Sequence, residues 1–370
     1  MKVIQILPEL NAGGVERGTL EVADYLIKNG HQSIVISNGG TMVAELEKTG
    51  SRHLTMPVHR KALASLAQIS KLRKVFLEEK PDLIHLRSRM PAWLAYLAWK
   101  TLDKRTRPRL VTTVHGFYSV NAYSAVMTKG ESVIAVSESV RDYILKNYPA
   151  TDSTKLRVIH RGVDEALYPV GFVPSEEWLA AWKSAQPERA GRIPLLLPGR
   201  LTRWKGQQDF IKMVAKLVAL GEPVHGLIVG GPHPKKVAFL DELKALAASL
   251  GIADRISFLG HRTDLKEIMA VSTVVYSLSL DPEAFGRVSL EALALGKPVI
   301  GYDHGGVAEQ LRAIFPQGLV KTGDVDRAID LTREILKSRP CPLSIEAFTL
   351  RRMLESTFDV YQTLLAKPRS

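Results

Sequence analysis

Cysteine is nearly absent from this 370-residue sequence, which contains only Cys341. A single cysteine excludes an internal disulfide and a cysteine-rich zinc site. Long apolar runs are also missing: the nearest candidate, residues 91–99, is far shorter than the roughly 18 apolar residues of a spanning helix. The opening residues MKVIQILPEL are too short and too polar for the core of a secretion signal. We therefore expect a cytoplasmic protein that does not cross a membrane.

The composition that remains is that of a folded protein, with 45% hydrophobic and 24% charged residues. These proportions exclude a disordered, collagen-like or coiled-coil chain. Because single hydrophobic cores stop growing at roughly 250–300 residues, a chain of this length is expected to form two domains.

Short β-branched runs alternate with helical stretches along the whole chain. The runs are KVIQIL, QSIVIS, DLIHL, RLVTTV and SVIAVS in the first half, and IPLLLPG, VHGLIVGG, RISFLG, TVVYSLS and KPVIGYD in the second. This alternation predicts an α/β fold with parallel sheets, and the mostly apolar runs predict helices on both sheet faces.

A proline-rich segment after Tyr168, without a clean strand as far as residue 192, separates the two halves. The prediction is an N-terminal domain over residues 1–168 and a C-terminal domain over residues 169–346. Residues 347–370 carry apolar side chains at helical spacing and lead into no further strand, which predicts a terminal helix.

Positive charge is concentrated between Arg52 and Arg109, where fourteen Lys and Arg residues stand against four Asp and Glu residues. The whole chain has a formal net charge of +12. Such a patch suits nucleic acid, anionic lipid or a phosphorylated substrate, and the sign of the charge does not choose among them.

Two glycines, Gly13 and Gly14, stand where the first predicted strand passes into a helix. A glycine turn there lets a phosphate approach the backbone N–H groups at the positive end of the helix, although a plain tight turn explains the glycines equally well. The spacing differs from the dinucleotide fingerprint, and the second strand ends in SNGG rather than an acidic residue, which disfavours nicotinamide binding.

Arg200 and Lys205 flank another predicted strand-to-helix loop, GRLTRWKG. An arginine and a lysine five residues apart across such a loop can converge on one anion, and a pyrophosphate fits this arrangement. A solvated basic loop is the alternative, which we favour for the intervening Arg203.

Two glutamates eight positions apart, Glu283 and Glu291, bracket the start of a predicted helix. The backbone N–H groups from Ala284 to Arg287 lie near that helix start and can bind hydroxyls or a phosphate. Glu291 is surrounded in sequence by alanine and leucine, where a carboxylate needs a partner, and a ribose diol is a suitable one. The alternatives are an exposed loop carboxylate for Glu283 and an exposed helix face for Glu291.

These segments together resemble the retaining glycosyltransferases of family 4, which have the GT-B architecture. The matching segments are Gly13-Gly14, VIHRGVD at 158–164, GRLTRWKG at 199–206, FLGHRTDL at 258–265, and the Glu283 and Glu291 pair. At closer range, NAGGVERGTLE, HLRSRMPAW and VHGFYSVNAYS look like bacterial lipopolysaccharide-core glycosyltransferases. The resemblance implies two facing Rossmann-like domains, an N-terminal one for the acceptor and a C-terminal one for the nucleotide-sugar donor, with the terminal helix crossing back to the first.

Roles for individual residues follow from the resemblance by position. Arg200 and Lys205 would stabilise the departing diphosphate, and Glu291 would hold the donor ribose. Glu283 and the amides near Phe285 and Gly286 would hold the donor sugar. His115, at a predicted strand end, matches the family's histidine beside the sugar, although a structural histidine is the commoner case. The expected donor contacts are then Gly14, Arg200, Lys205, Ala284, Phe285, Gly286 and Glu291.

Metal is not expected in this site. Asp324-Val325-Asp326 has the D-x-D spacing of a metal motif, but it follows Gly323 and opens a predicted helix, so helix capping explains it better. Family members generally use the cationic pair in place of a metal at the diphosphate, and no cofactor is expected.

The combined hypothesis is a retaining, metal-independent transfer of a hexose from a nucleoside-diphosphate sugar, with UDP favoured, to a glycolipid or oligosaccharide acceptor in lipopolysaccharide-core assembly. The alternatives are a nucleotide-sugar epimerase of the same fold and a non-catalytic nucleic-acid-binding protein. No recognition-helix or base-stacking motif supports the second alternative.

The basic segment is assigned to the acceptor or to the inner face of the cytoplasmic membrane. Cations beside an apolar helical stripe, with aromatic residues on the next helix, suit peripheral docking on anionic lipid. Two of the arginines end a strand and could bind acceptor phosphates instead. The residues of this predicted patch are Lys61, Lys71, Arg73, Lys74, Arg87 and Arg89.

Overall fold

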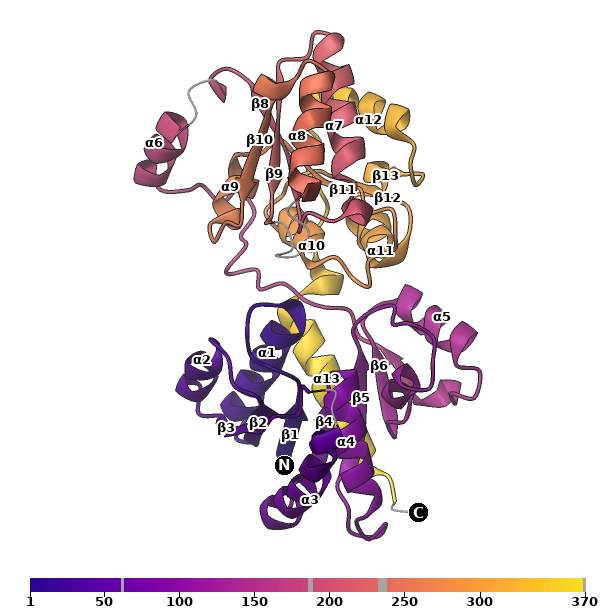
Figure 1. Cartoon of the computed structure of the whole chain (residues 1–370). Coiled ribbons are helices and arrows are strands. Elements are labelled where there is room, and N and C mark those ends of the chain that lie inside the picture. The colour runs from indigo at the N-terminus through magenta and orange to yellow at the C-terminus, as the bar shows by residue number, and fades with distance from the viewer. Residues whose placement is uncertain (61–62, 186–188, 232–237, 369–370) are drawn as a thin grey trace. The chain divides into compact units, whose positions relative to one another are not determined.

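The computed structural model describes residues 1–60, 63–185, 189–231 and 238–368. The chain forms two compact units (Figure 1). Unit 1 consists of Met1–Gly162 and Leu350–Ser370, and unit 2 consists of Val163–Thr349. The last helix therefore belongs to the unit that the first half of the chain builds.

Unit 1 contains a sheet of seven parallel strands in the order β3-β2-β1-β4-β5-β6-β7. Its inner strands are buried along nearly their whole length, which explains why their sequences are apolar rather than alternating. The strands are β1 (Lys2–Ile6), β2 (Gln32–Ser37), β3 (Arg52–Thr55), β4 (Leu83–Leu86), β5 (Arg109–Val114), β6 (Ser132–Ala135) and β7 (Leu156–Val158).

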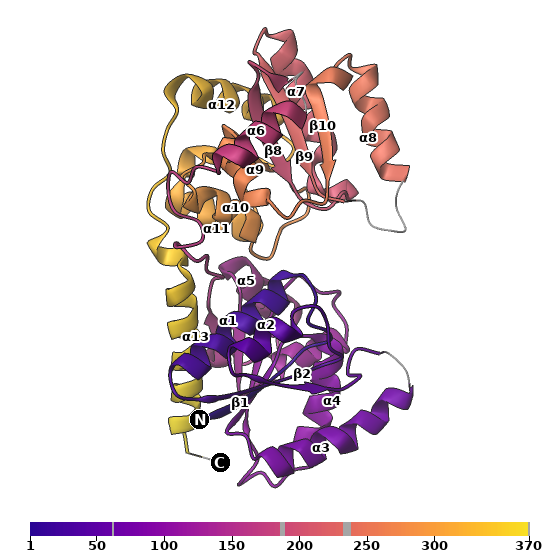
Figure 2. The same cartoon turned by 90° about the vertical axis from the view of Figure 1, so that its left-hand side faces the viewer.

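Helices connect these strands and lie along both faces of the sheet (Figures 1 and 2). The helices of unit 1 are α1 (Gly14–Lys28), α2 (Val43–Lys48), α3 (Ala67–Glu79), α4 (Arg89–Lys100), α5 (Glu138–Asn147) and α13 (Leu350–Ala366). Ser137 accepts a hydrogen bond from the backbone N–H of Val140 (3.1 Å) and caps α5.

Unit 2 contains a second parallel sheet of six strands in the order β10-β9-β8-β11-β12-β13. Its strands are β8 (Ile193–Pro198), β9 (Val224–Val229), β10 (Ile256–Gly260), β11 (Val274–Ser277), β12 (Val299–Tyr302) and β13 (Leu319–Val320). Its helices are α6 (Glu176–Ala185), α7 (Gln207–Ala219), α8 (Ala238–Ser249), α9 (Leu265–Val271), α10 (Arg287–Ala294), α11 (Gly305–Ile314) and α12 (Val325–Ser338). The predicted α/β fold with two parallel, Rossmann-like sheets is confirmed.

Each sheet has one point where the strand order reverses. The reversal lies between β1 and β4 in unit 1 and between β8 and β11 in unit 2. In open α/β sheets, ligands bind beyond the carboxyl ends of the strands at this switch point, because the connections diverge there and leave a crevice. The loops that start α1 and α4, and those that start α7 and α10, are therefore the places to examine for function.

Helix α13 closes the hydrophobic core of unit 1 (Figure 2). Met353, Leu354, Tyr361 and Leu364 are buried in one cluster with side chains from α1 and from β1, β4, β5 and β6. These burials attach the helix to a sheet whose strands are nearly 200 residues or more away in the sequence.

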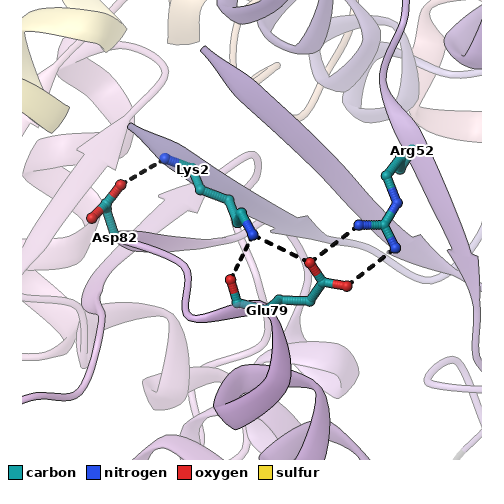
Figure 3. Close-up of polar contacts among 4 residues, drawn as sticks. All are labelled: Lys2, Arg52, Glu79 and Asp82. Carbon is teal, nitrogen blue, oxygen red and sulfur yellow. Dashed lines mark hydrogen bonds and ion pairs between the residues drawn. The ribbon is translucent and has the colours of Figure 1, made fainter.

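The amino ends of the unit 1 strands are fastened by an ionic cluster (Figure 3). Glu79, the last residue of α3, receives two hydrogen bonds of 3.1 Å from the Arg52 guanidinium. Lys2 donates its Nζ to the Glu79 carbonyl (2.7 Å) and its backbone N–H to Asp82 (2.7 Å). The hydrogen bond from Arg52 is the main factor that lowers the pKa of Glu79. This cluster joins β1, β3 and the α3–β4 turn.

Over the described residues, no helix combines the length and the apolar character that crossing a membrane requires.

Candidate active site

The switch point of unit 2 is built by close backbone packing around the start of α7. Gly206, the residue before α7, has a φ of 76°, and a Cβ there would lie 2.0 Å from the carbonyl oxygen of Leu278. The backbone N–H of Leu280 donates to the carbonyl of Trp204 (2.6 Å). Only glycine fits this position, because the β8–α7 loop lies directly against the loop that follows β11.

Lys205 and Glu283 form an ion pair across these two loops, with Nζ 2.8 Å from Oε2. Both side chains are 18% exposed. The other carboxylate oxygen of Glu283 accepts a hydrogen bond of 2.6 Å from the Ser279 hydroxyl. The sequence-predicted cation and carboxylate thus meet at the carboxyl edge of the sheet, where solvent still reaches both.

Arg200 lies at the same edge with an exposed side chain. Its backbone carbonyl accepts a hydrogen bond from the buried Gln207 at the start of α7 (3.1 Å), which fixes the main chain but leaves the guanidinium in solvent. Arg203, in contrast, is paired with Glu242 (2.7 Å) on α8. The two arginines therefore differ, because an ion pair holds the Arg203 side chain whereas the Arg200 side chain is exposed.

The loop from Glu283 to Gly286 is held from behind by α11. A Cβ on Gly305 would lie 2.5 Å from the Glu283 carbonyl oxygen, and the backbone N–H of Gly306 donates to that carbonyl (2.8 Å). The fully buried Gln310 donates its amide to the carbonyls of Phe285 (2.5 Å) and Gly286 (3.2 Å). Because a trans peptide points its N–H opposite to its C=O, these contacts turn the N–H groups of Gly286 and Arg287 away from α11.

Gln310 was not predicted as part of the site. It lies 19 residues beyond Glu291, in a helix whose apolar pattern explains its burial, and its role depends on a tertiary contact. The short motif that precedes it, Gly305-Gly306, does carry a signal, because two adjacent glycines at a strand-to-helix turn indicate close backbone approach.

Glu291 lies in the second turn of α10 and is 15% exposed. Arg287, one turn earlier, places its Nε 3.8 Å from Oε1 of this carboxylate. A partly buried carboxylate such as that of Glu291 needs a partner, and Arg287 of the same helix is one. Both glutamates of the pair are partly covered, and each has a cation beside it.

In unit 1, α1 begins at Gly14, directly after the extended Gly13. The carboxylate of Glu16 lies over this turn, since a Cβ on Gly13 would be only 2.2 Å from Glu16 Oε2. An acidic side chain in the first turn is favourable at the positive end of a helix. The start of α1 is exposed at both glycines.

His115 follows β5 at the switch-point edge of unit 1. Its Nδ1 lies 2.6 Å from Nη2 of Arg161. Burial, followed by the charges of Arg161 and Arg87, lowers the pKa of His115 well below its ordinary value of 6.5. His85 on β4 is buried between the hydroxyls of Tyr361 and Thr113, both at 2.6 Å, and its pKa is lowered well below 6.5 for the same reasons.

Arg87 is not a surface residue, which corrects its assignment to the exposed basic patch. Its side chain is 1% exposed and its Nε donates to Oε1 of Gln5 on β1 (2.7 Å). It follows directly on a four-residue strand that is buried throughout, so the chain carries it inside the unit. Burial lowers the pKa of the Arg87 guanidinium without discharging it.

Arg89, at the start of α4, is partly buried between aromatic rings. Its guanidinium lies 4.6 Å from the ring centroid of Tyr118 and 5.5 Å from that of Tyr123, and it donates to the Ser124 hydroxyl (3.2 Å). Cation–π contacts of this kind hold the loop after β5 in place. Arg89 therefore packs against the segment that follows β5.

Three further cations of the predicted patch lie on α3. Lys71, Arg73 and Lys74 are exposed, and Lys74 pairs with Glu78 one turn later (3.6 Å). Lys61 lies outside the described residues.

Asp324 acts as the N-cap of α12, because its Oδ1 accepts the backbone N–H of Arg327 (2.9 Å). The capping explanation of the D-x-D sequence is confirmed for this residue. Within the part of the chain that the structure describes, no group of three or more His, Cys, Asp or Glu side chains is arranged to hold a metal ion.

Two family models match the chain in sequence. Residues 12–167 match Glycosyltransferase Family 4, and residues 180–349 match Glycosyl transferases group 1. The two matches coincide closely with the N-terminal and C-terminal sheets.

Several known proteins with similar sequence or structure are named as glycosyltransferases. A glycosyltransferase from Rickettsia africae is 30% identical, with 99% of each chain covered and a TM-score of 0.86. The N-acetyl-alpha-D-glucosaminyl L-malate synthase of Bacillus anthracis is 28% identical over 74% of this chain and 70% of its own length. Anabaena Alr3699/HepE in complex with UDP-glucose shares the fold at 20% identity, with 98% of each chain covered and a TM-score of 0.76.

The chain spans about half the length of the curated D-inositol 3-phosphate glycosyltransferases that it matches. That of Stackebrandtia nassauensis is 31% identical over 61% of this chain and 54% of its own length. Taken together with the two switch points, these similarities identify the chain as a member of the family 4 glycosyltransferases with the GT-B fold.

Proposed function

We propose that this enzyme transfers a hexose from a UDP-sugar to an anionic acceptor, with retention of the anomeric configuration and without a metal ion. The observation that carries the proposal is the Lys205–Glu283 pair beside the exposed Arg200 at the switch point of unit 2. The two cations would stabilise the negative charge that develops on the departing diphosphate. Glu283 would then contact the sugar, and Glu291 the ribose.

The helix starts of unit 2 would complete the donor site. The loop N–H groups of Phe285, Gly286 and Arg287 lie at the N-terminus of α10, where the helix dipole favours a partially negative group. Gln310 keeps that loop in place from the opposite side. In unit 1 we propose that Gly14 allows a close approach of the ligand and that His115 contacts the transferred sugar.

The acceptor would be a glycolipid of the lipopolysaccharide-core type, because the motifs around residues 11–21, 85–93 and 114–124 resemble those enzymes. A small anionic acceptor is the second candidate, since the similar enzyme from Bacillus anthracis is named for L-malate. Both candidates carry negative charge and suit the basic first half of the chain.

A screen of purified enzyme separates these possibilities. The enzyme is incubated with UDP-, ADP- and GDP-hexoses in excess chelator, and with either core glycolipid or L-malate as acceptor. We expect UDP release only with a UDP-hexose, glycolipid-dependent product, and an anomeric proton coupling in the product that matches the donor. Inverted product, activity only after a divalent ion is added, or an isomerised UDP-sugar without acceptor would each contradict the proposal. Product with L-malate alone would select the second candidate.

Peripheral membrane contact is a separate part of the proposal and involves α3. Leu66, before α3, is 53% exposed and Leu77 is 49% exposed, and Arg73 lies between them on the same helical face. Lys74 lies beside this stripe, and Lys71 is exposed on the same helix. Apolar residues bordered by cations suit an anionic lipid surface, where each cation contributes about 1 kcal/mol.

Vesicle co-sedimentation tests the membrane contact. The triple variant Lys71→Gln, Arg73→Gln, Lys74→Gln should lose most of its binding to vesicles that contain phosphatidylglycerol. The matched control removes three exposed lysines elsewhere in unit 1, Lys28, Lys48 and Lys146, and should bind nearly as wild type. Equal losses in both triples would reduce the effect to net charge and remove α3 from the proposal.

A further inference from the structure

The contact between Arg161 and His115 fixes where the imidazole carries its proton. Arg161 follows β7 and is 8% exposed. Its Nη2 lies 2.6 Å from His115 Nδ1. A guanidinium nitrogen can only donate and stays protonated in proteins, so Nδ1 must accept this hydrogen bond through its lone pair.

A neutral imidazole has one N–H, which must then be on Nε2. The groups that face His115 favour the neutral ring. They are the cations Arg161 and Arg87, the neutral His85, and the phenol of Tyr118, which accepts the His115 backbone N–H (3.2 Å). With two guanidinium groups nearby and little solvent, the pKa of His115 is lowered well below 6.5.

The Nε2 atom is covered and has no hydrogen-bond partner among the described residues. A covered N–H without an acceptor costs about 1–3 kcal/mol, and such groups are rare in folded proteins unless a ligand completes them. This donor lies at the carboxyl end of β5, beside the switch point, where no described protein group accepts from it.

The position of Arg161 is itself built into the fold. A Cβ on Gly18 of α1 would lie 2.6 Å from Arg161 Nη1, so the helix has a glycine where the guanidinium passes. The same Nη1 lies 3.8 Å from the Met353 sulfur on α13. Two helices far apart in the sequence therefore confine the side chain that contacts His115.

We propose that Arg161 is a positioning residue that holds His115 as the neutral, Nε2-protonated imidazole, so that His115 presents a hydrogen-bond donor to a sugar oxygen and does not act as a base through Nε2. The identity of that oxygen as part of a sugar rests on the proposed function. The tautomer itself does not, because it follows from the contacts of the protein alone.

Nitrogen NMR of the unliganded enzyme tests the tautomer directly. The protein is labelled with ¹⁵N-histidine, and His115 is assigned among the ten histidines by comparison with His115→Gln. We expect a pyrrole-type Nε2 and a pyridine-type Nδ1 that persist as the pH is lowered to about 5.5, a unit below the ordinary histidine pKa. A protonated Nδ1, or an imidazolium near pH 6.5, would overturn the proposal, and this result needs no substrate and no catalytic activity of the His115→Gln variant.

Activity measurements then test the positioning role. Arg161→Met should lower kcat by about tenfold, the usual size of one lost hydrogen bond to a charged group or transition state, and should add an acidic limb to the pH profile near pH 6.5. Arg161→Lys, which keeps a cationic donor, should restore most of the rate and remove that limb.

The matched control is Arg157→Met on β7, where the side chain bonds only to backbone carbonyls in the contacts that the structure gives it. It should leave both the rate and the profile unchanged. A kcat loss in Arg161→Met with an unchanged pH profile and an unchanged His115 spectrum would mean a merely structural arginine. If no UDP-sugar is turned over by the wild type, the transfer proposal fails while the NMR result still stands or falls by itself.

Discussion

The two switch points use positive charge in opposite ways. In unit 2, Lys205 is 18% exposed and contacts a carboxylate, while Arg200 is exposed. In unit 1, Arg87 is 1% and Arg161 is 8% exposed, and each donates to a neutral partner, Gln5 or His115. The first arrangement keeps charge available to a ligand. The second keeps charge inside the unit, where it determines which protonation state a neighbouring histidine can have.

The contrast follows from dielectric environment. A cation near solvent can exchange its carboxylate partner for a phosphate at a small cost in free energy. Water solvates the charges and weakens both ion pairs, so little is lost when one replaces the other. A buried guanidinium keeps its charge and acts strongly on any titratable group beside it. Cationic side chains at the carboxyl ends of the strands are therefore expected to act on a ligand in unit 2 and on a neighbouring histidine in unit 1.

The largest expected effect comes from removing the exposed cations. Lys205→Ala and Arg200→Ala should each lower turnover by about 100-fold, as expected when one preorganised group loses its contact with transition-state charge. The measurement is the rate of UDP release at saturating donor. Arg203→Ala serves as the control and should be mild, because Arg203 pairs with Glu242 instead. Near-normal turnover in both Lys205→Ala and Arg200→Ala would show that the cations of unit 2 do not act on a ligand, and the proposed difference between the two switch points would be lost.

The two carboxylates of unit 2 should separate binding from chemistry. Glu291→Gln should weaken UDP binding by about tenfold, since a neutral amide loses one charge-assisted hydrogen bond. Glu283→Gln should leave UDP binding within about twofold and reduce sugar transfer. Calorimetry with UDP measures the first effect and steady-state kinetics the second. Unchanged UDP affinity in Glu291→Gln would remove the ribose from its proposed contacts.

Buried histidine in unit 1 should make the stability depend on pH. The folded protein keeps His85 neutral, while the unfolded chain binds a proton below about pH 6.5, so acidification favours unfolding. For this histidine, the free energy of unfolding should fall by about 1.4 kcal/mol in total as the pH decreases from about 7.5 to about 5.5.

Urea denaturation of wild type and His85→Gln across that range measures this dependence. The variant should be the less stable at neutral pH but should show the shallower decline. His261→Gln, at an exposed position, should retain the wild-type decline. Parallel curves for wild type and His85→Gln would show that the neutral histidine is not a feature of the fold.

The smallest expected effect lies at the amino end of unit 1. Arg52→Gln removes the arginine that pairs with Glu79. Because the Arg52 side chain is 59% exposed, the free energy of unfolding should fall by only about 0–1 kcal/mol at neutral pH. Because the pKa of Glu79 is lowered from 4.5, this difference should disappear as the pH falls below that value and the carboxylate is protonated. Turnover should not change, because the cluster lies at the amino ends of the strands and the switch point at their carboxyl ends. A measurable loss of turnover would mean that a change at the amino ends affects the switch point.

The inner strands of both sheets could be predicted from the sequence, and three of the four edge strands could not. Every predicted strand was found, because strands buried on both faces must be apolar runs. The three strands that were missed, β3, β7 and β13, lie at sheet edges and have only two to four residues. Exposed edge strands carry mixed polar residues, so no periodic apolar signal marks them.

The candidate site divides in a similar way. Arg200, Lys205, Glu283 and Glu291 belong to local motifs, so the sequence alone was enough to propose them as candidates. The contacts of Gln310, of Arg87 and between Arg161 and His115 join segments 25, 82 and 46 residues apart. Spacing in the sequence contains no information about such pairs without the topology.

The return of α13 to unit 1 has a consequence for biosynthesis. On the ribosome, residues 1–162 emerge without the helix that contributes Met353, Leu354, Tyr361 and Leu364 to their core. The hydrogen bond between His85 and the Tyr361 hydroxyl, which lies 276 residues further along the chain, cannot form until α13 has been synthesised. Unit 2 is synthesised as one uninterrupted segment and can complete its core first, although domains usually fold in the order of their synthesis. The nascent first half therefore leaves the apolar side chains that α13 covers exposed until the second half has been made.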